Sequence, residues 1–201
     1  MKKGIIITIA TVCVIMAAAA GVFVAVSKGL FHHKEAKGLI LYGTEEQLSK
    51  DSKLEKADTV YTYQTKVKLI EDNLMIIREK DMQEFCKQQI VNKIDAQNQC
   101  EPVSEIESAE KTPVYYAKDP KTGIKVGEKE LEVTAGKDYI IGSGRMFDEG
   151  YLVVSDTLYE ELQGEETGML VLGLNKAADK EIGQCEFEQV QLIDIQTGTV
   201  D

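Results

Sequence analysis

The 201-residue chain is poor in the side chains on which most enzyme sites depend. It has no tryptophan, only 6% aromatic residues, and two histidines, the adjacent His32 and His33. A Ser-His-Asp or Cys-His hydrolase needs an imidazole beside its nucleophile, and neighbouring histidines lack the spacing of a zinc site. We therefore interpret the pair as part of a solvated spacer, and we expect no metal ion and no cofactor.

Nucleotide and calcium motifs are absent as well. No Gly-x-x-x-x-Gly-Lys-Ser/Thr run or alternating Asp/Asn calcium loop occurs, and Gly142-Ser143-Gly144, which lacks a third glycine, predicts a turn. Carboxylate pairs such as Glu160-Glu161 and Glu165-Glu166 leave a carboxylate-based hydrolase as one alternative. Few aromatic residues are present to stack on a sugar, which argues against this alternative. Together with the shortage of histidine, this leads us to predict that the chain is not an enzyme.

Acidic side chains dominate everything after the N-terminal segment. Residues 35 to 201 contain 34 acidic and 19 basic side chains, a net charge of −15. Such a charge repels phosphates, which excludes nucleic acid as a partner and argues against binding to an anionic lipid surface. Three prolines and the absence of low-complexity tracts argue against a stalk or linker protein.

The apolar exception is a run of 24 uncharged residues, Gly4 to Ser27. As a helix it reaches about 36 Å, enough to cross a hydrocarbon core of about 30 Å. The alternative is a secretory signal cleaved near Ala25-Val26-Ser27. Both interpretations export the remainder, and we favour the retained anchor because the run is longer than an ordinary signal core. Cys13 lacks the flanking pattern of a lipid-modified cysteine, so we interpret it as a small apolar residue in this helix.

The expected localisation is the cell membrane, with a single pass. Residues 1–3 form a cytoplasmic tail, 4–27 a transmembrane helix or uncleaved signal anchor, 28–37 a juxtamembrane linker, and 38–201 an extracytoplasmic domain. Positive charges flank the run on both sides, so the orientation follows from the short N-terminal tail, because long domains translocate largely regardless of charge.

Residue patterns predict an α+β domain, with one mixed or antiparallel sheet and two or three short helices. Thr44-Glu45-Glu46-Gln47 has the spacing of a capping box. Alternation predicts a strand from Val60 to Ile70, paired through a turn with a second strand at Leu74 to Ile77. Asp81 is the expected N-cap of a helix that continues through Asp95.

The second half predicts short strands and tight turns. The polar stretch Ala96 to Thr112 is expected to be a loop, and Leu158 to Gln163 a brief helix stopped by Gly164. Strands are predicted at Pro113 to Ala117, Ile124 to Val126, Leu131 to Val133, Tyr139 to Ile141, Tyr151 to Val154, Gly168 to Leu174 and Cys185 to Ile195, of which the first four form an antiparallel meander.

Three cysteines, Cys86, Cys100 and Cys185, lie outside the apolar run. A Cys86–Cys100 disulfide would close a ring of about 15 residues and contribute about 3 kcal/mol. The alternative, which we favour, is buried free thiols, because a domain of this length can bury enough core without a covalent link.

The segment Tyr151-Leu152-Val153-Val154-Ser155-Asp156-Thr157-Leu158-Tyr159-Glu160-Glu161-Leu162 resembles a strand-to-helix segment of extracytoplasmic domains in ABC-transporter permeases of the bacitracin- and lantibiotic-resistance type. The segments Leu74 to Met82, Leu131 to Tyr139 and Met169 to Asn175 are similar in character. The resemblance implies an extracellular domain that engages a peptide antibiotic or lipid-linked envelope precursor. It also implies partners: a separate ATPase, a permease or a sensor kinase. No ligand-binding residue follows from it, and the chain, with one apolar run, forms no transport path alone.

The function predicted from these patterns is a membrane-anchored extracytoplasmic binding or sensing domain. The alternative is a cell-surface structural or assembly protein that acts only through protein–protein contacts. A fragment of a permease, a divergent single-pass relative and a domain that merely shares the pattern all fit the first interpretation.

Overall fold

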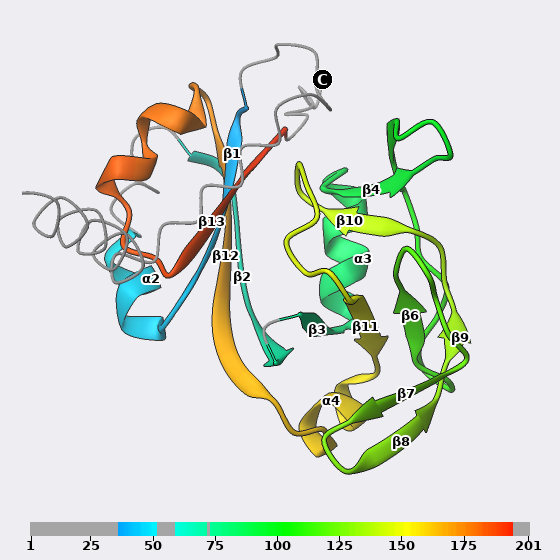
Figure 1. Cartoon of the computed structure of the whole chain (residues 1–201). Helices are drawn as coiled ribbons and strands as arrows, with labels where there is room; N and C mark the ends of the chain where they lie inside the picture. The colour runs from blue at the N-terminus through cyan, green and yellow to red at the C-terminus, as the bar shows by residue number, and fades with distance from the viewer. Residues whose placement is uncertain (1–35, 52–58, 72, 195–201) are drawn as a thin grey trace, which may run out of the picture.

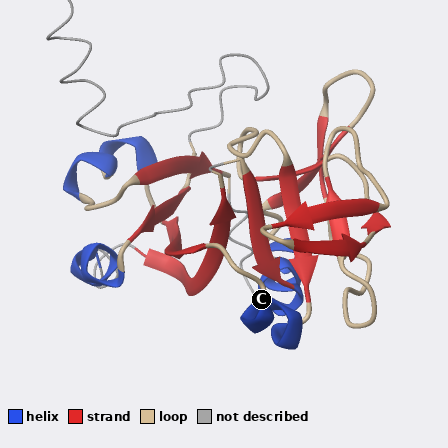
Figure 2. Cartoon of the chain, turned by 60° about the horizontal axis from the view of Figure 1, so that its bottom comes forward, coloured by secondary structure: helices blue, strands red, loops and turns tan. Residues whose placement is uncertain are grey.

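The computed structural model describes residues 36–51, 59–71 and 73–194, and it confirms the predicted α+β class. One eight-stranded sheet runs through the molecule, and the short helices pack against its strands (Figures 1 and 2). In sheet order its strands are β13 (Gln189–Ile193), β1 (Gly38–Gly43), β12 (Glu165–Leu174), β2 (Thr59–Ile70), β3 (Leu74–Arg78), β11 (Gly150–Val154), β6 (Val114–Tyr116) and β9 (Thr134–Ala135).

This sheet is mixed. The pairs β3–β11 and β6–β9 are parallel, and the other neighbouring strands are antiparallel. Two smaller sheets accompany it. One has the order β10 (Tyr139–Ile141), β4 (Val91–Ile94) and β5 (Cys100–Pro102), and the other is the hairpin of β7 (Gly123–Val126) and β8 (Lys129–Glu132).

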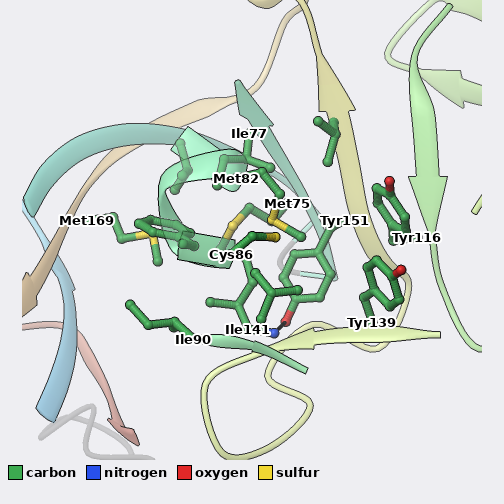
Figure 3. Packing of buried hydrophobic residues seen from close by; sticks show 14 of the residues in the cluster. Met75, Ile77, Met82, Cys86, Ile90, Tyr116, Tyr139, Ile141, Tyr151 and Met169 are labelled. Carbon is green, nitrogen blue, oxygen red and sulfur yellow. Dashed lines mark hydrogen bonds between the residues drawn. The ribbon is translucent and has the colours of Figure 1, made fainter. Parts of the chain in front are cut away.

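The central strands are buried on both faces because successive side chains point to opposite sides of a strand. In β3, Met75 and Ile77 join the core under α3 (Glu79–Lys87), while Leu74 and Ile76 join the core on the opposite face. Figure 3 shows the first core, in which the Tyr151 hydroxyl accepts a hydrogen bond from the Ile141 amide at 3.2 Å. Double-sided burial explains why these strands are continuous apolar runs.

Two helix starts follow from local hydrogen bonding. The predicted capping box forms at α2 (Glu45–Asp51): the Gln47 amide donates to Thr44 Oγ1 at 3.2 Å, and the Thr44 amide donates to Gln47 Oε1 at 2.7 Å. Helix α4 (Asp156–Glu161) is capped by Ser155, whose hydroxyl accepts from the Leu158 amide at 3.3 Å.

The predicted long helix is shorter than expected. Helix α3 begins after Arg78, so Asp81 lies inside its first turn rather than at the N-cap. The chain leaves the helix at Gln89, where φ is 57°, and the apolar residues that follow enter strand β4. Ile94 therefore fits a helical spacing by coincidence, because it pairs with Cys100 in the small sheet. Ile90 lies between α3 and β4, and its amide donates to the Phe85 carbonyl at 2.9 Å.

Pairing between strands that are distant in the sequence accounts for the other differences between the predicted and the observed elements. Strand β1 was not predicted, although all six of its residues are buried. The expected meander is wrong in part, because β6 pairs with β11 and β9 while β10 pairs with β4; only the β7–β8 hairpin of that prediction forms. The predicted loop after Ala96 contains β5, and the final strand is limited to β13, preceded by the 3-10 turns η2 (Ala178–Lys180) and η3 (Ile182–Gln184).

Candidate ligand-binding cavity

A cavity of about 670 Å³ opens at one end of the large sheet. The β2–β3 turn, the segment between α4 and β12, the β7–β8 hairpin and the residue before β11 form its walls. Its lining residues are Leu69, Ile70, Glu71, Asn73, Leu74, Lys125, Gly127, Glu149, Gln163, Gly164 and Glu165. Apolar side chains from two strands thus share the cavity with three carboxylates and one ammonium group.

The turn between β2 and β3 fixes the first wall. Glu71 has a φ of 49°, in the left-handed region that non-glycine residues seldom adopt, and the Asn73 amide closes the turn by donating to the Ile70 carbonyl at 3.1 Å. The Glu149 amide donates to the Asn73 carbonyl at 3.0 Å. Two of the three carboxylates are therefore carried by segments joined through backbone hydrogen bonds.

A buried cation fixes the second wall. Lys68, which is 9% exposed, donates from Nζ to the Tyr159 carbonyl at 2.7 Å and to the Leu162 carbonyl at 2.8 Å. These carbonyls lie at the C-terminal end of α4, where the negative end of the helix dipole favours a positive charge. Lys68 therefore ties α4 to β2 and holds the segment that leads into β12.

The connection from α4 to β12 passes very close to β2. A Cβ atom on Gly164 would lie 2.9 Å from Lys68 Cβ and 3.0 Å from Ile70 Cδ1. Carbon atoms in favourable contact stay about 3.5–4.0 Å apart. Gly164 is required here because it lets the chain approach β2 and brings Glu165, the first residue of β12, to the cavity.

Tyr159 supports this wall from the core. Two cations contact its ring: Lys68 Nζ lies 4.6 Å and the Arg78 guanidinium carbon 3.6 Å from the ring centroid. Arg78 also pairs with Glu160 at 2.8 Å. Burial raises the pKa of the Tyr159 hydroxyl to about 12, so the hydroxyl stays protonated at ordinary pH.

Several glutamates of the domain are held in ion pairs, whereas among the described residues the three exposed carboxylates of the cavity are not. Lys66 pairs with Glu45 at 2.7 Å and with Glu166 at 3.1 Å, and Lys129 pairs with Glu161 at 2.8 Å. Within the described residues, by contrast, no ion pair involves the carboxylates of Glu71, Glu149 or Glu165, or the Lys125 ammonium. The four charged side chains of the lining therefore sum to −2, and no ion pair among the described residues offsets that charge.

A second buried acidic group has a structural explanation. Asp81 is 1% exposed, and its two carboxylate oxygens accept hydrogen bonds from the Tyr63 and Thr65 hydroxyls, each at 2.7 Å. Both acceptors are satisfied, and α3 is joined to β2 by this contact. Asp81 therefore fixes the helix to the sheet and is not available to a ligand.

The residues singled out in the sequence do not come together in one reactive site. Glu160 and Glu161 pair with separate cations, and of Glu165 and Glu166 only Glu165 reaches the cavity. Gly142 has a φ of 80° and lies in a turn, as predicted. In the described part of the chain no group of three His, Cys, Asp or Glu side chains is placed to hold a metal ion, and His32 and His33 lie outside it.

The cysteine prediction is partly resolved. Cys86 is buried with a free thiol, and burial raises its pKa to about 12. Cys100 is half-buried and is also not joined to Cys86, so the alternative disulfide is wrong. Its pKa is raised by burial and by the negative charges of Asp95 and Asp138.

Sequence patterns did not predict that these three carboxylates would line one cavity. Glu71 was part of a predicted turn and Glu165 part of a noted pair, but Glu149 stood in no motif. The only shared signal is that each lies beside the end of a strand, at a point where the chain turns.

Comparison with known proteins agrees with an exported, membrane-attached domain that has an α+β fold. The chain belongs to an uncharacterised lipoprotein family, whose profile matches residues 36–196. A crystal structure of a Bacillus anthracis protein described as a lipoprotein is similar, with a TM-score of 0.67 and 16% sequence identity over 80% of this chain and 100% of that one. At this identity the likeness concerns the fold alone. No curated protein matches.

Family membership corrects the expected localisation. A lipoprotein is held at the membrane surface through a lipid, so the single-pass topology predicted from hydropathy is wrong. The physical reason is that hydropathy registers only apolarity and length, which an export leader and a spanning helix share. No helix among the described residues is long and apolar enough to cross a bilayer. The run Gly4 to Ser27, with Cys13, lies outside those residues.

Proposed function

We propose that this protein is a surface-attached binding or sensing domain that holds a cationic ligand in the cavity formed by Glu71, Glu149 and Glu165. The single observation that carries the proposal is the group of three carboxylates without ion-pair partners around a cavity of about 670 Å³. Ligand sites commonly have such volumes, and they combine an apolar lining with a few polar groups that orient the ligand.

The lining favours one of the two ligand classes suggested by the permease resemblance. Leu69 and Ile70, which are half-buried, offer apolar contact, and the carboxylates attract positive charge. An amphipathic cationic peptide matches both features. A lipid-linked envelope precursor that carries phosphate groups would meet repulsion, because the cavity and the whole domain are negative. We therefore propose a cationic peptide as the ligand class.

The proposed partners follow from the same resemblance. A surface domain that binds a peptide without an enzymatic step must pass on the binding event through another protein. An ABC-transporter ATPase with its permease, or a sensor kinase, is the proposed recipient. Because Val60 is the one large apolar side chain that is exposed among the described residues, contact with such a partner would rest mainly on polar surface.

The test is a titration of the full-length chain, in a mild detergent, with a soluble peptide of alternating lysine and leucine. The probe variant replaces Glu71, Glu149 and Glu165 by glutamine, and the control variant replaces Glu101, Glu105 and Glu110, which lie outside the cavity lining. Both variants change the net charge equally. We expect the probe variant to lose about 0.6–3 kcal/mol of binding free energy, from about 0.2–1 kcal/mol for each exposed ion pair.

Salt provides a second readout, because long-range attraction between the peptide and the acidic domain weakens with screening. We expect the association rate of the wild-type chain to fall as ionic strength rises. Equal affinities of the probe and control variants would reject the cavity as the binding site. The absence of peptide binding, together with stable complexes in crosslinked membranes, would favour the structural or assembly alternative.

A further inference from the structure

Most of strand β2 has a neighbouring strand on only one side, because β12 pairs along nearly all of it and β3 only with residues 68–70. Alternate residues of an antiparallel strand point their amides and carbonyls to opposite edges. The Lys66 carbonyl faces β3, since it accepts a hydrogen bond at 3.2 Å from Nη1 of Arg78, the last residue of that strand. Thr62 and Gln64 therefore point their backbone groups to the same edge, beyond the end of β3. Both residues are exposed, and among the described residues these backbone groups have no hydrogen-bond partner.

The open part of this edge is short and uncharged. At one end the pairing of β2 with β12 shifts beside Val60, which forms a bulge. At the other end Arg78 binds the Lys66 carbonyl. Residues 61–65 lie between these points, and we call them the β2 edge. Proteins commonly protect an exposed strand edge with charged residues or proline, and the β2 edge contains neither.

Two tyrosine rings form a floor beside the β2 edge. Of the eight tyrosines in the chain, only Tyr61 and Tyr63 are not buried. The Tyr61 hydroxyl donates to Glu84 at 3.2 Å, and the Tyr63 hydroxyl donates to Asp81 at 2.7 Å. Both rings thus reach from β2 to α3, which runs from the end of β3 alongside β2 (Figure 1). They present fixed, partly exposed aromatic surface next to free backbone groups.

We propose that the β2 edge binds an extended segment of a partner protein as an added strand. Strand addition takes its affinity from main-chain hydrogen bonds and its specificity from alternate side chains. The backbone groups of Thr62 and Gln64 bond to the segment, and its residues on the tyrosine side are apolar or aromatic. Its flanking residues are neutral or basic, because residues 35 to 201 carry a net charge of −15, which repels acidic chains.

The same charge opposes the other obvious occupant, a second copy of this chain, because each copy brings an equal negative charge. The site is also separate from the cavity, whose lining includes none of residues 61–65. The inference therefore adds a second binding surface and does not depend on the proposed function. It agrees with a partner contact that is mainly polar, since the exposed edge of a strand consists of amides and carbonyls.

The first experiment changes only the peptide. The probe has the alternating core Thr-Val-Thr-Val between pairs of lysines, carries a fluorescent label, and is titrated with the full-length chain in a mild detergent. Two further peptides carry N-methyl groups on both threonines or on both valines. In an added strand only one alternate set of amides faces β2, the threonines if the strand is antiparallel and the valines if it is parallel.

We expect methylation of one set to weaken binding about fivefold or more, because two net hydrogen bonds are lost, and methylation of the other set to leave the affinity unchanged. Equal effects of the two methylations, or no binding of the unmethylated probe, would overturn the proposal. This comparison uses the wild-type chain, so it does not depend on the folding of any variant.

The second experiment changes the protein. Gln64→Pro removes one amide of the β2 edge and leaves the bonds to β12 in place, whereas the control Gln64→Ala keeps that amide. We expect about two- to tenfold weaker probe binding for Gln64→Pro and wild-type binding for Gln64→Ala. If circular dichroism shows that Gln64→Pro is unfolded, the methylated peptides decide alone.

Two controls separate this surface from the alternatives. The variant with glutamine at positions 71, 149 and 165 should bind the probe as the wild type does, even if the proposed function of the cavity fails. Loss of probe binding in that variant, with no loss in Gln64→Pro, would overturn the proposal. Sedimentation measures self-association, and a dimer that Gln64→Pro abolishes and the probe does not displace would assign the β2 edge to a second copy instead.

Discussion

Gly164 allows a direct test of how the cavity is built. Its missing side chain lets the α4–β12 connection lie against β2, and an added Cβ would approach Lys68 Cβ to 2.9 Å and Ile70 Cδ1 to 3.0 Å. Lys68 Cβ is fixed close to the backbone, so it cannot turn aside as the end of a long side chain could. In Gly164→Ala the connection must therefore move away from β2 by about 0.5 Å or more to restore ordinary contact.

The magnitude follows from two opposing effects. Overpacking of this kind costs about 1–3 kcal/mol. Replacing glycine by alanine reduces the freedom of the unfolded chain and offsets about 0.4–1 kcal/mol of that cost. We therefore expect Gly164→Ala to lower the free energy of unfolding by about 1.3 kcal/mol, the difference between the centres of the two ranges, with about 2.6 kcal/mol as the upper limit. We also expect it to weaken peptide binding, because the displacement carries Glu165 with it.

A matched variant separates the contact from the general effect of the substitution. A Cβ on Gly183, in η3, meets no atom within 4 Å, so Gly183→Ala should leave stability unchanged or raise it by up to about 1 kcal/mol. The assay is urea unfolding of the full-length chain in a mild detergent, followed by circular dichroism because the sequence has no tryptophan. If both variants unfold at the same urea concentration as the wild type, the close approach at Gly164 does not control this wall.

Three further predictions concern buried polar groups. Lys68→Met keeps the length of the side chain but removes two charge-assisted hydrogen bonds to the end of α4, and it should cost about 2–4 kcal/mol by urea unfolding; an unchanged midpoint would mean that the cation does not hold the helix. Asp81→Ala strands the Tyr63 and Thr65 hydroxyls and should cost about 2–4 kcal/mol, whereas Asp81→Asn, which keeps one acceptor, should cost less; the reverse order would refute this role. Burial raises the pKa of the Tyr151 hydroxyl to about 12, so the folded protein holds this proton more tightly than the unfolded chain does. The stability that Tyr151 contributes is therefore complete below about pH 10 and is lost between about pH 10 and 12. Tyrosinate absorbance and circular dichroism, recorded together, measure this loss. Ionisation of Tyr151 in the folded protein near pH 10 would contradict that expectation.

Elements set by local chemistry could be predicted from the sequence. The capping box at Thr44 and the β2–β3 hairpin depend on residues that are close in the chain, and both form as expected. The helix from Asp81 was predicted to continue too far, because a run of apolar residues near one helical face does not reveal that Gln89 adopts a φ of 57° and that Val91 pairs with Ile141. Pairing between distant segments wins over local periodicity in this region.

The candidate site depends on the same long-range information. Glu71 and Glu149 lie in two turns far apart in the sequence, and the parallel pairing of β3 with β11 places them beside each other. Glu165 is the first residue of β12. The antiparallel pairing of β12 with β2 adds the third. Short-range sequence patterns specify neither strand pairing. The excess of acidic side chains could therefore be predicted from composition, but the clustering of three of them around one cavity could not.

Lys125 supplies the most direct test that charge in the cavity governs binding, because removing it makes the cavity more negative. Loss of a carboxylate can weaken binding for several reasons, but the gain expected from Lys125→Gln has the opposite sign and needs an electrostatic cause. The measurement is the affinity of the soluble lysine–leucine peptide for the full-length Lys125→Gln variant, with Lys121→Gln, outside the cavity lining, as the control. We predict binding that is tighter by about 0.2–1 kcal/mol than in the control. Equal or weaker binding would contradict the proposal that this cavity selects a cation.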